Sequence, residues 1–372
     1  YGGSEANIAL ALANLGVDST FFSVVPNNSL GKSAVRWLRS NDVHCTPMIL
    51  TEPDETPSNR LGTYYLETGY GIRPSKVIYD RKHSAITEYD FSQVDLDELL
   101  EGFDWLHLSG ITPALAPNCR GLIIDMLKEA KKKGLTVSFD GNFRSTLWSW
   151  EEARDFIKTG LGPAFKEAGV TTKIYVFDHN YNYDNLADQK SYPTKIYDDA
   201  EASQYIAGAA YHNYGGNRSE LLNIHKLYPN KELLFTETSI GTWNSGRDLE
   251  ARLLNDMEEI ALGTANNWCR GTIVWNLMLD SDLGPVSPSD GSCKTCYGAV
   301  DIDNTNYSKI VRNSHYYLIG HMSSVVKPGA VRIGTTGYTA NGITYSAFEN
   351  TDGTYAVSYT HLRAHETEAD LV

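Results

Sequence analysis

The chain has 372 residues, of which 41% are hydrophobic and 21% charged, and its formal net charge is −14. This length predicts about two domains, and the absence of a run of about 18 apolar residues excludes a membrane-spanning helix. The acidic excess argues against nucleic acid or an anionic membrane as partner, because phosphates would be repelled. The chain begins with Tyr1 rather than Met, and we expect it to be a fragment.

Residues 1–154 predict strands that alternate with helices. Apolar residues at helical spacing in YGGSEANIALALANLG indicate a helix that ends at Gly16. The other predicted helices cover residues 30–42 and 122–134, and the predicted strands cover 20–26, 45–50, 60–69, 76–81, 105–110 and 135–140. This alternation is typical of a parallel sheet in an α/β layer architecture.

Five segments of this region occur in an order that carries a family resemblance: YGGSEANIALALANLG, LGTYYLETG, RPSKVIYDRKHSAI, WLHLSGITPAL and SFDGNFRSTLWSWEEA. Together they resemble the ribokinase-like (PfkB) sugar kinases, specifically the 2-keto-3-deoxygluconate kinases. The resemblance implies a sugar-acid pocket lined by Gly3, Asn7, Tyr64, Tyr79, Arg81 and Arg144. An arginine fork suits the carboxylate of a sugar acid. The alternatives are an ordinary glycine turn, strand-packing tyrosines and surface ion pairs.

The kinase resemblance also implies ATP and Mg²⁺, for which we expect no site in this chain. The family's GAGD-type motif belongs about 80–100 residues after Arg144, and the sequence does not contain it. In that motif, glycine amides at a helix N-terminus hold the developing phosphate charge, and the Asp takes the proton of the sugar hydroxyl.

From Asp155 the sequence changes in character while strands and helices still alternate. The predicted helices cover residues 155–169, 200–208, 219–231 and 249–267, with strands at 171–180, 209–216, 232–243 and 271–280. Polar and aromatic residues follow these strands: Asp178, His179, His212, Tyr214, Glu237 and Trp275. This pattern is typical of a (β/α)8 barrel, whose chemistry lies at the C-terminal strand ends. Four strands make half a barrel, and residues 331–357 predict a small β appendage.

The segments FIKTGLGP, KIYVFDHN, AGAAYHNYGG, LFTETSIGTW, NWCRGTIVWNLMLDSDLGP and YYLIGHMSSVVKPGAVRI resemble glycoside hydrolase family 30, the glucosylceramidase-like enzymes. The resemblance implies that Glu237 is the nucleophile, with His212 and Tyr214 beside it. It also implies that Trp275 stacks on a sugar ring and that Asp178 and Asn180 lie at the fifth strand end. The alternatives are a solvated carboxylate for Glu237, a core histidine for His212 and core packing for Trp275.

One catalytic group of that family is expected to be absent. Retaining glycosidases use two carboxylates about 5–5.5 Å apart, one as nucleophile and one as acid/base. The resemblance places the acid/base in an NEP motif upstream of the FIK…LGP helix, and the sequence contains no NEP. We therefore expect little or no glycosidase activity.

The five cysteines predict neither a disulfide framework nor a metal site. Cys293 and Cys296 fit a loop disulfide or two reduced thiols, because no second Cys/His pair completes a zinc site. Cys45, Cys119 and Cys269 are expected to be buried thiols.

The sequence thus predicts a chimera with a partial ribokinase-like parallel sheet, half of a (β/α)8 barrel and a β appendage. The expected parts are residues 1–154, 155–310, 311–357 and a tail, 358–372, that resembles translated sequencing adapter. We expect two units without a shared core, divided at Arg154–Asp155, where neither family overlaps the other.

The predicted function is that of a family 30-like glycosidase fragment fused to a sugar-acid kinase fragment. The alternatives are a 2-dehydro-3-deoxygluconokinase and a carbohydrate-binding protein without catalysis. A carbohydrate is the expected partner in each case, without a metal. The kinase resemblance implies a cytoplasmic protein and the glycosidase resemblance a secreted or periplasmic one, so the compartment stays open.

Overall fold

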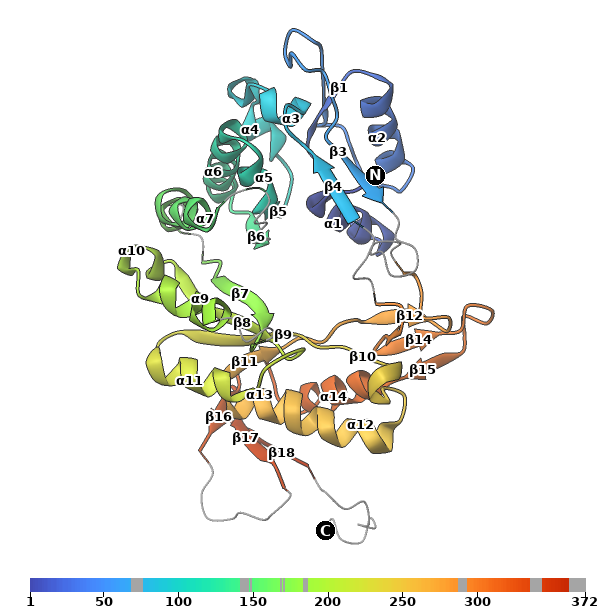
Figure 1. The fold of residues 1–372 in the computed structure, drawn as a ribbon, viewed down its shortest axis with the longest axis vertical. Helices are drawn as coiled ribbons and strands as arrows, with labels where there is room; N and C mark the ends of the chain where they lie inside the picture. The colour runs from blue at the N-terminus through green and yellow to red at the C-terminus, as the bar shows by residue number, and fades with distance from the viewer. Residues whose placement is uncertain are drawn as a thin grey trace. The chain divides into compact units, whose positions relative to one another are not determined.

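The computed structural model describes residues 1–67, 76–140, 147, 149–167, 169, 171–182, 187–286, 293–334 and 343–360 (Figure 1). The chain divides into two compact units. Unit 1 comprises Tyr1–Ile174 and Ala200–Tyr205, and unit 2 comprises Tyr175–Asp199 and Ile206–Val372.

Helices and strands alternate along unit 1, as the sequence predicts. Its elements are α1 (Ser4–Asn14), β1 (Val24–Pro26), α2 (Ser29–Arg39), β2 (Ile49–Thr51), β3 (Thr63–Glu67), β4 (Lys76–Asp80), α3 (Ala85–Glu88), η1 (Phe91–Gln93), α4 (Leu96–Leu99), β5 (Trp105–Ser109), α5 (Ile111–Leu115), α6 (Pro117–Lys132), β6 (Thr136–Asp140), α7 (Trp150–Phe156), the π-helical turn η2 (Ile157–Leu161), α8 (Gly162–Glu167) and α10 (Ala200–Ser203). Strands β1 and β2 pair in parallel, as do β5 and β6, whereas β3 and β4 form an antiparallel hairpin.

Local sequence signals explain where several of these helices begin. The side chain of Asn28 accepts hydrogen bonds from the backbone N–H groups of Leu30 and Gly31 and so caps α2. Pro117 begins α6, where its missing N–H costs no hydrogen bond. The apolar face of α6 is buried, including Leu122, Ile123 and Leu127.

The main hydrophobic core of unit 1 includes residues on both sides of Arg154. Phe156, Leu161 and Phe165 are buried in one cluster with residues of β5, α6 and β6. Residues 155–174 therefore pack with the preceding residues, and the compact units divide at Ile174–Tyr175 rather than at Arg154–Asp155. The physical reason is that the apolar face of α7, η2 and α8 requires cover, and the sheet and helix before it provide that cover.

The sheets of unit 2 begin with β7, whose first residue lies at the unit boundary. The elements are β7 (Ile174–Asn180), α9 (Ala187–Tyr197), β8 (Ile206–His212), α11 (Ser219–Leu227), β9 (Glu232–Glu237), β10 (Ile240–Gly241), η3 (Thr242–Asn244), α12 (Leu249–Asp256), the π-helical turn η4 (Met257–Ala261), α13 (Leu262–Asn266), β11 (Cys269–Thr272), β12 (Met278–Asp280), β13 (Cys296–Tyr297), β14 (Val300–Ile302), β15 (Ile310–Arg312), α14 (Ser314–Ser323), β16 (Val331–Ile333), β17 (Tyr345–Glu349) and β18 (Tyr355–Tyr359).

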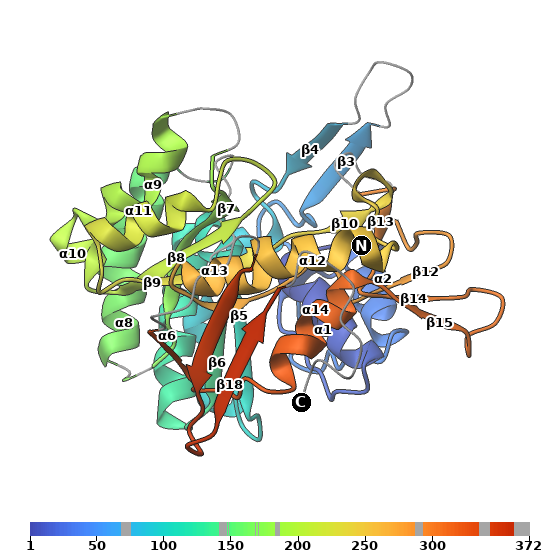
Figure 2. The same cartoon turned by 90° about the horizontal axis from the view of Figure 1, so that it is seen from below.

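The principal sheet of unit 2 has the strand order β11-β9-β8-β7, and β9 pairs in parallel with both β8 and β11. Three further sheets are β12-β14-β15, the antiparallel β16-β17-β18, and the short pair β10-β13. Helix α14 lies alongside α12 in both views (Figure 1; Figure 2). In the described part of the chain, no helix is both long and apolar enough to cross a membrane.

Elements predicted after Asp155 differ from the structure at two notable places. The predicted helix over residues 200–208 ends at Ser203, and strand β8 begins at Ile206. Pairing with β9 explains the change, because Gly208 lies so close to Glu232 that an added Cβ would be 1.9 Å from its carbonyl oxygen. The predicted strand over 271–280 is divided between β11, which pairs with β9, and β12, which pairs with β14.

A buried polar group between α12 and α14 predicts a pH-dependent stability. His315 is fully buried, its Nε2 lies 3.9 Å from Asp256 Oδ2, and neither ring nitrogen has a hydrogen-bond partner among the described residues. Burial lowers the pKa of His315 from 6.5 to about 4, with Arg252 contributing. The unfolded state therefore binds more protons, and unfolding becomes easier as the pH falls from 6.5 toward 4, by up to about 3 kcal/mol.

The measurement is the urea unfolding free energy of wild type and His315→Gln between pH 7 and pH 4. Burial raises the pKa of Asp256, which gives a pH dependence of the opposite sign, but this carboxyl is present in both proteins. We expect the wild type to lose stability relative to the variant as the pH falls. Parallel pH profiles would contradict the assignment to His315.

Candidate active site

The carboxyl ends of β7, β8 and β9 bring together a carboxylate, a histidine and a hydroxyl. His212 Nε2 lies 3.0 Å from Asp178 Oδ1, and Thr236 Oγ1 donates to the same oxygen at 2.6 Å. The hydrogen bond from His212 lowers the pKa of Asp178, and the one from Thr236 acts in the same direction. Asp178 is therefore held as a carboxylate, and its position orients the buried ring of His212.

The backbone at the end of β7 has an uncommon conformation. Phe177 and Asp178 have φ values of 79° and 51°. Non-glycine residues rarely adopt this left-handed region, and such positions cluster at functional sites. The consequence here is that Asp178 turns toward the neighbouring strands, where it meets His212 and Thr236.

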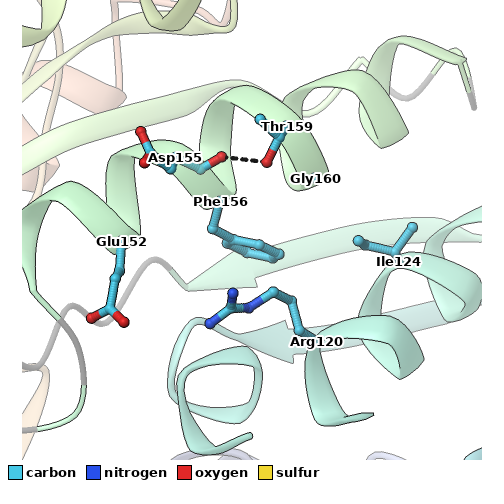
Figure 3. Close-up of a pocket in the computed structure, with 7 residues that line it drawn as sticks. All are labelled: Arg120, Ile124, Glu152, Asp155, Phe156, Thr159 and Gly160. Carbon is cyan, nitrogen blue, oxygen red and sulfur yellow. Dashed lines mark hydrogen bonds between the residues drawn. The ribbon is translucent and has the colours of Figure 1, made fainter. Parts of the chain in front are cut away.

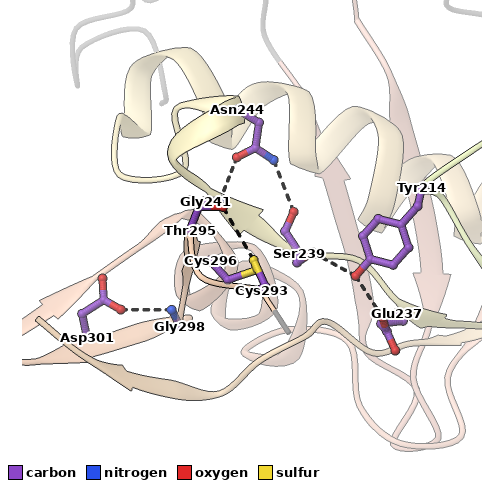
Figure 4. The surroundings of a disulfide bond; sticks show 10 residues. All are labelled: Tyr214, Glu237, Ser239, Gly241, Asn244, Cys293, Thr295, Cys296, Gly298 and Asp301. Atoms are coloured by element: carbon purple, nitrogen blue, oxygen red, sulfur yellow. Dashed lines mark hydrogen bonds between the residues drawn. A yellow bond between two sulfur atoms is a disulfide. The ribbon is translucent and has the colours of Figure 1, made fainter. Parts of the chain in front are cut away.

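Glu237 ends β9 and forms the second polar contact at this edge. Tyr214 Oη donates to Glu237 Oε1 at 3.0 Å, and Ser239 Oγ donates to Tyr214 Oη at 2.9 Å (Figure 4). Burial raises the pKa of Tyr214, the hydrogen bond from Ser239 opposes this, and the charge of Glu237 adds to it. The phenol therefore stays protonated and donates to the carboxylate.

Trp275 and two asparagines complete the edge. Trp275 N donates to the Thr238 carbonyl oxygen at 2.7 Å, so this tryptophan lies beside the segment that follows Glu237. Its side chain is exposed. Asn180 Oδ1 and Asn276 Oδ1 are both buried without a hydrogen-bond partner among the described residues. Such oxygens can accept hydrogen bonds from ligand hydroxyls.

The structure thus brings Asp178 into contact with His212, and Tyr214 into contact with Glu237. Asn180 ends β7, and Trp275 follows β11 in the same sheet. Three further residues at this edge were not predicted from the sequence: Thr236, Ser239 and Asn276. A usable signal existed, because each of the three lies within two residues of a predicted site residue: Thr236 and Ser239 flank Glu237, and Asn276 follows Trp275.

The sugar-acid residues predicted in unit 1 are partly brought together. Tyr64 and Tyr79 are register partners in the β3-β4 hairpin with ring centroids 6.3 Å apart, and Arg81 Cζ lies 4.1 Å from the Tyr79 ring. A Cβ added to Gly2 would be 3.6 Å from Tyr64 Oη, so the N-terminal turn is adjacent to this hairpin. Gly3 precedes α1, and Asn7 is exposed on that helix. Arg144 lies outside the described residues.

A cavity of about 280 Å³ lies elsewhere in unit 1, between α6 and the helix that begins with α7 (Figure 3). It is lined by Arg120, Ile124, Glu152, Asp155, Phe156, Thr159 and Gly160. Arg120 Cζ lies 5.9 Å from the Phe156 ring, and Thr159 Oγ1 donates to the Asp155 carbonyl oxygen. No predicted site residue lines this cavity.

The cysteines follow one of the two alternatives that the sequence left open. Cys293 and Cys296 form a disulfide. Cys45 and Cys119 are buried thiols and Cys269 is half-buried. Burial raises the pKa of Cys119 to about 12. Among the described residues, no group of three His, Cys, Asp or Glu side chains could hold a metal ion.

Comparison with known families places this geometry in context. The family model for the glycosyl hydrolase family 30 TIM-barrel domain matches residues 128–326, which is more than half of the chain. The chain belongs to glycosyl hydrolase family 30. The model for the β-sandwich domain of this family matches residues 329–358, the region of β16, β17 and β18.

A second family also matches this family 30 chain. The model for pfkB family carbohydrate kinases matches residues 1–165 and overlaps the TIM-barrel match over residues 128–165. The chain is therefore a chimera of both families, as predicted, but the expectation that the two sequences do not overlap is wrong. The overlap covers the end of α6, then β6, α7, η2 and the first part of α8.

Curated relatives match each of the two family regions of the chain. A 2-dehydro-3-deoxygalactonokinase from Haloferax volcanii is 37% identical over 41% of this chain and 46% of its own length. The endo-1,6-β-D-glucanase BGN16.3 from Trichoderma harzianum is 32% identical over 57% of this chain and 40% of its own length. The chain thus spans less than half of either curated relative.

A solved structure, the endo-β1,6-glucanase BT3312, is 64% identical and has a TM-score of 0.57. The match covers 65% of this chain and 56% of that structure. It supports the family 30 assignment at the level of fold.

Proposed function

We propose that unit 2 carries a retaining β-glycosidase centre in which Glu237 is the nucleophile and β-1,6-linked glucose polymers are the substrate class. The observation that carries the proposal is the hydrogen bond from Tyr214 to Glu237 at the end of β9. The substrate class is taken from endo-1,6-β-glucanases among the relatives.

The residues at the strand ends have separate tasks in this proposal. Glu237 attacks the anomeric carbon, the bond to the leaving oxygen breaks, and a glycosyl-enzyme forms that water then hydrolyses. Tyr214 holds one carboxylate oxygen, which leaves the other for attack. Asn180 and Asn276 accept hydrogen bonds from sugar hydroxyls, and the exposed ring of Trp275 packs on the sugar face.

The proposal assigns no acid/base residue in this chain. The family's NEP motif does not occur in the sequence, and we propose that residues 175–310 represent half of a (β/α)8 barrel without that strand end. Glycosides with poor leaving groups then react slowly, because protonation of the leaving oxygen contributes about 10²–10⁴ in rate. The chimera is accordingly inactive on its polymer and competent only for activated glycosides.

The anomeric configuration of the first product tests the proposal. With 2,4-dinitrophenyl β-glucoside, we expect β-glucose to appear first in the NMR spectrum and Glu237→Gln to abolish its release. The matched control is Glu232→Gln, which makes the same change at the other end of β9. Release of α-glucose first, or full activity of Glu237→Gln, would contradict the role of Glu237.

A second candidate function, sugar-acid binding by unit 1, is favoured by the cluster of Tyr64, Tyr79 and Arg81. We expect Arg81→Ala to weaken binding of 2-keto-3-deoxygluconate about tenfold or more, because a hydrogen bond to a charged group is lost. Isothermal calorimetry measures this, with Arg36→Ala on the exposed face of α2 as control. Equal affinities of the two variants would exclude Arg81 from the site.

We propose no phosphate transfer by this chain. The kinase family implies ATP and Mg²⁺, and the GAGD-type motif of that family does not occur in the sequence. Sugar-acid binding is the part of the kinase function that this proposal retains.

A further inference from the structure

Ser239 binds the hydroxyl oxygen of Tyr214 and so helps to hold it in place. A tyrosine hydroxyl has one proton to donate. Ser239 Oγ donates to Tyr214 Oη at 2.9 Å, so the phenol oxygen is the acceptor in that contact and its own proton is free for Glu237 Oε1, 3.0 Å away. Ser239 is buried, so water does not replace it readily. Ser239 is therefore one of the groups that fix the position of the phenol that donates to Glu237.

A short turn holds the backbone of Ser239. Asn244 Nδ2 donates to the Ser239 carbonyl oxygen at 3.2 Å, and Asn244 Oδ1 accepts a hydrogen bond from Gly241 N at 2.9 Å. One asparagine side chain thus ties both ends of the segment 239–241 (Figure 4). Neither contact touches the carboxylate of Glu237.

The segment that contains the disulfide binds this turn. In the described part of the chain β10 pairs with β13 alone, and Gly241 is the register partner of Cys296. Thr242 N donates to the Thr295 carbonyl oxygen at 2.9 Å. An added Cβ at Gly241 would lie 2.4 Å from that same oxygen, so the two segments are in close contact.

The far side of the disulfide loop is fixed independently. Gly298 N donates to Asp301 Oδ1 at 3.0 Å, and Arg247 binds Asp301 while its guanidinium lies 4.1 Å from the Tyr297 ring. At the opposite end of the loop, Cys293 is half-buried and Lys294 is exposed. The disulfide bond restrains Thr295 from this end, because it joins Cys293 to Cys296.

We propose that the Cys293–Cys296 disulfide and Ser239 form a positioning device for the nucleophile, with Ser239 as the positioning residue and the disulfide as a redox-sensitive clamp. The inference rests on the proposed function, because it concerns the orientation of Glu237. The closed loop holds β13, and β13 holds β10 and the turn. The turn holds Ser239, and Ser239 holds the hydroxyl of Tyr214 at the position from which it donates to Glu237.

A small dithiol opens this clamp. Its thiolate attacks the half-buried sulfur of Cys293, the disulfide bond breaks and Cys296 leaves as a thiolate that takes up a proton. The second thiol of the reagent then displaces Cys293 from the mixed disulfide. The protein gains two electrons and two protons, and the reagent becomes a cyclic disulfide.

The test is the rate of covalent labelling of Glu237 by 2-deoxy-2-fluoro-β-glucosyl fluoride, which needs little acid assistance. We expect reduction with dithiothreitol, Ser239→Ala, and the double variant Cys293→Ser/Cys296→Ser each to lower the labelling rate constant about tenfold. The concentration for half-maximal rate should change less than twofold, because no sugar contact is lost. Ser239→Thr, which keeps the hydroxyl, should restore most of the rate.

Two controls separate positioning from general loss of stability. Ser346→Ala removes another buried serine hydroxyl, which donates to Asn266 in a different part of unit 2, and should leave the rate unchanged. The double cysteine variant keeps Cys45, Cys119 and Cys269, so any dithiothreitol effect through those thiols would persist in it. We expect it to show none.

Each outcome has one consequence. If Ser239→Ala labels as fast as wild type, the positioning role of Ser239 is overturned. If the oxidised, reduced and double-cysteine proteins label equally fast while Ser239→Ala is slow, the clamp is overturned and Ser239 keeps its role. If the oxidised wild type does not label at all, the proposed function itself fails, and the inference fails with it.

Discussion

2,4-Dinitrophenyl β-glucoside is expected to be cleaved at least about 10²-fold faster than a β-1,6-linked glucose disaccharide, measured as kcat/KM. The nitrophenolate leaves without protonation, whereas the sugar hydroxyl requires a general acid, a contribution of about 10²–10⁴. The proposed centre supplies Glu237 as nucleophile but no acid/base, so only the activated substrate should turn over.

Azide provides the control for this prediction. In a retaining site without a general base, water attacks the glycosyl-enzyme slowly, whereas an anion needs no base. Azide should therefore accelerate turnover of the aryl glucoside and give β-glucosyl azide. Efficient hydrolysis of the disaccharide, with no response to azide, would show that an acid/base residue operates, and Asp178 would then be the first to replace.

Phe156→Ala is expected to destabilise unit 1 by about 3–5 kcal/mol, the usual cost of removing a large aromatic side chain from a core. Phe156 is 4% exposed and lies in the cluster that joins residues on both sides of Arg154. Urea unfolding gives the free energy, and hydrogen exchange of the α6 amides assigns the loss to unit 1.

The matched control is Phe103→Ala, because Phe103 is 39% exposed and loses less burial on truncation. A loss below about 1 kcal/mol for Phe156→Ala, with α6 protection unchanged, would mean that the α7 helix does not contribute to this core. In that case the compact unit that ends at Ile174 would not unfold as one unit of stability.

The alternation of helices and strands could be predicted because its signals are local. The apolar spacing of α1 and α6 and the β-branched run of β7 lie within single segments, and the structure contains each of these elements. The boundaries that failed depend on partners far along the chain. Residues 206–208 are strand rather than helix because β9 approaches Gly208 closely, and residue spacing carries no sign of that contact.

The candidate site, too, could be predicted only in part from the sequence. Glu237, His212 and Tyr214 end or follow strands, and the ends of parallel strands meet at one edge. The role of Ser239 depends on a chain of hydrogen bonds through three residues, and the turn that holds it depends on β13, about 55 residues further on. The sequence places the junction at Arg154–Asp155, where the family resemblance changes. The core of unit 1 extends beyond this junction, because the apolar face of α7 and α8 packs on the preceding elements.

Peptide mapping after labelling with 2-deoxy-2-fluoro-β-glucosyl fluoride tests the central claim, an assembled nucleophile in unit 2, most directly. We predict a single fluoroglucosyl adduct on the peptide that contains Glu237, present in Glu232→Gln and absent in Glu237→Gln. An adduct on a different carboxylate, or an intact mass that stays unchanged after prolonged incubation of the oxidised protein, would contradict the claim.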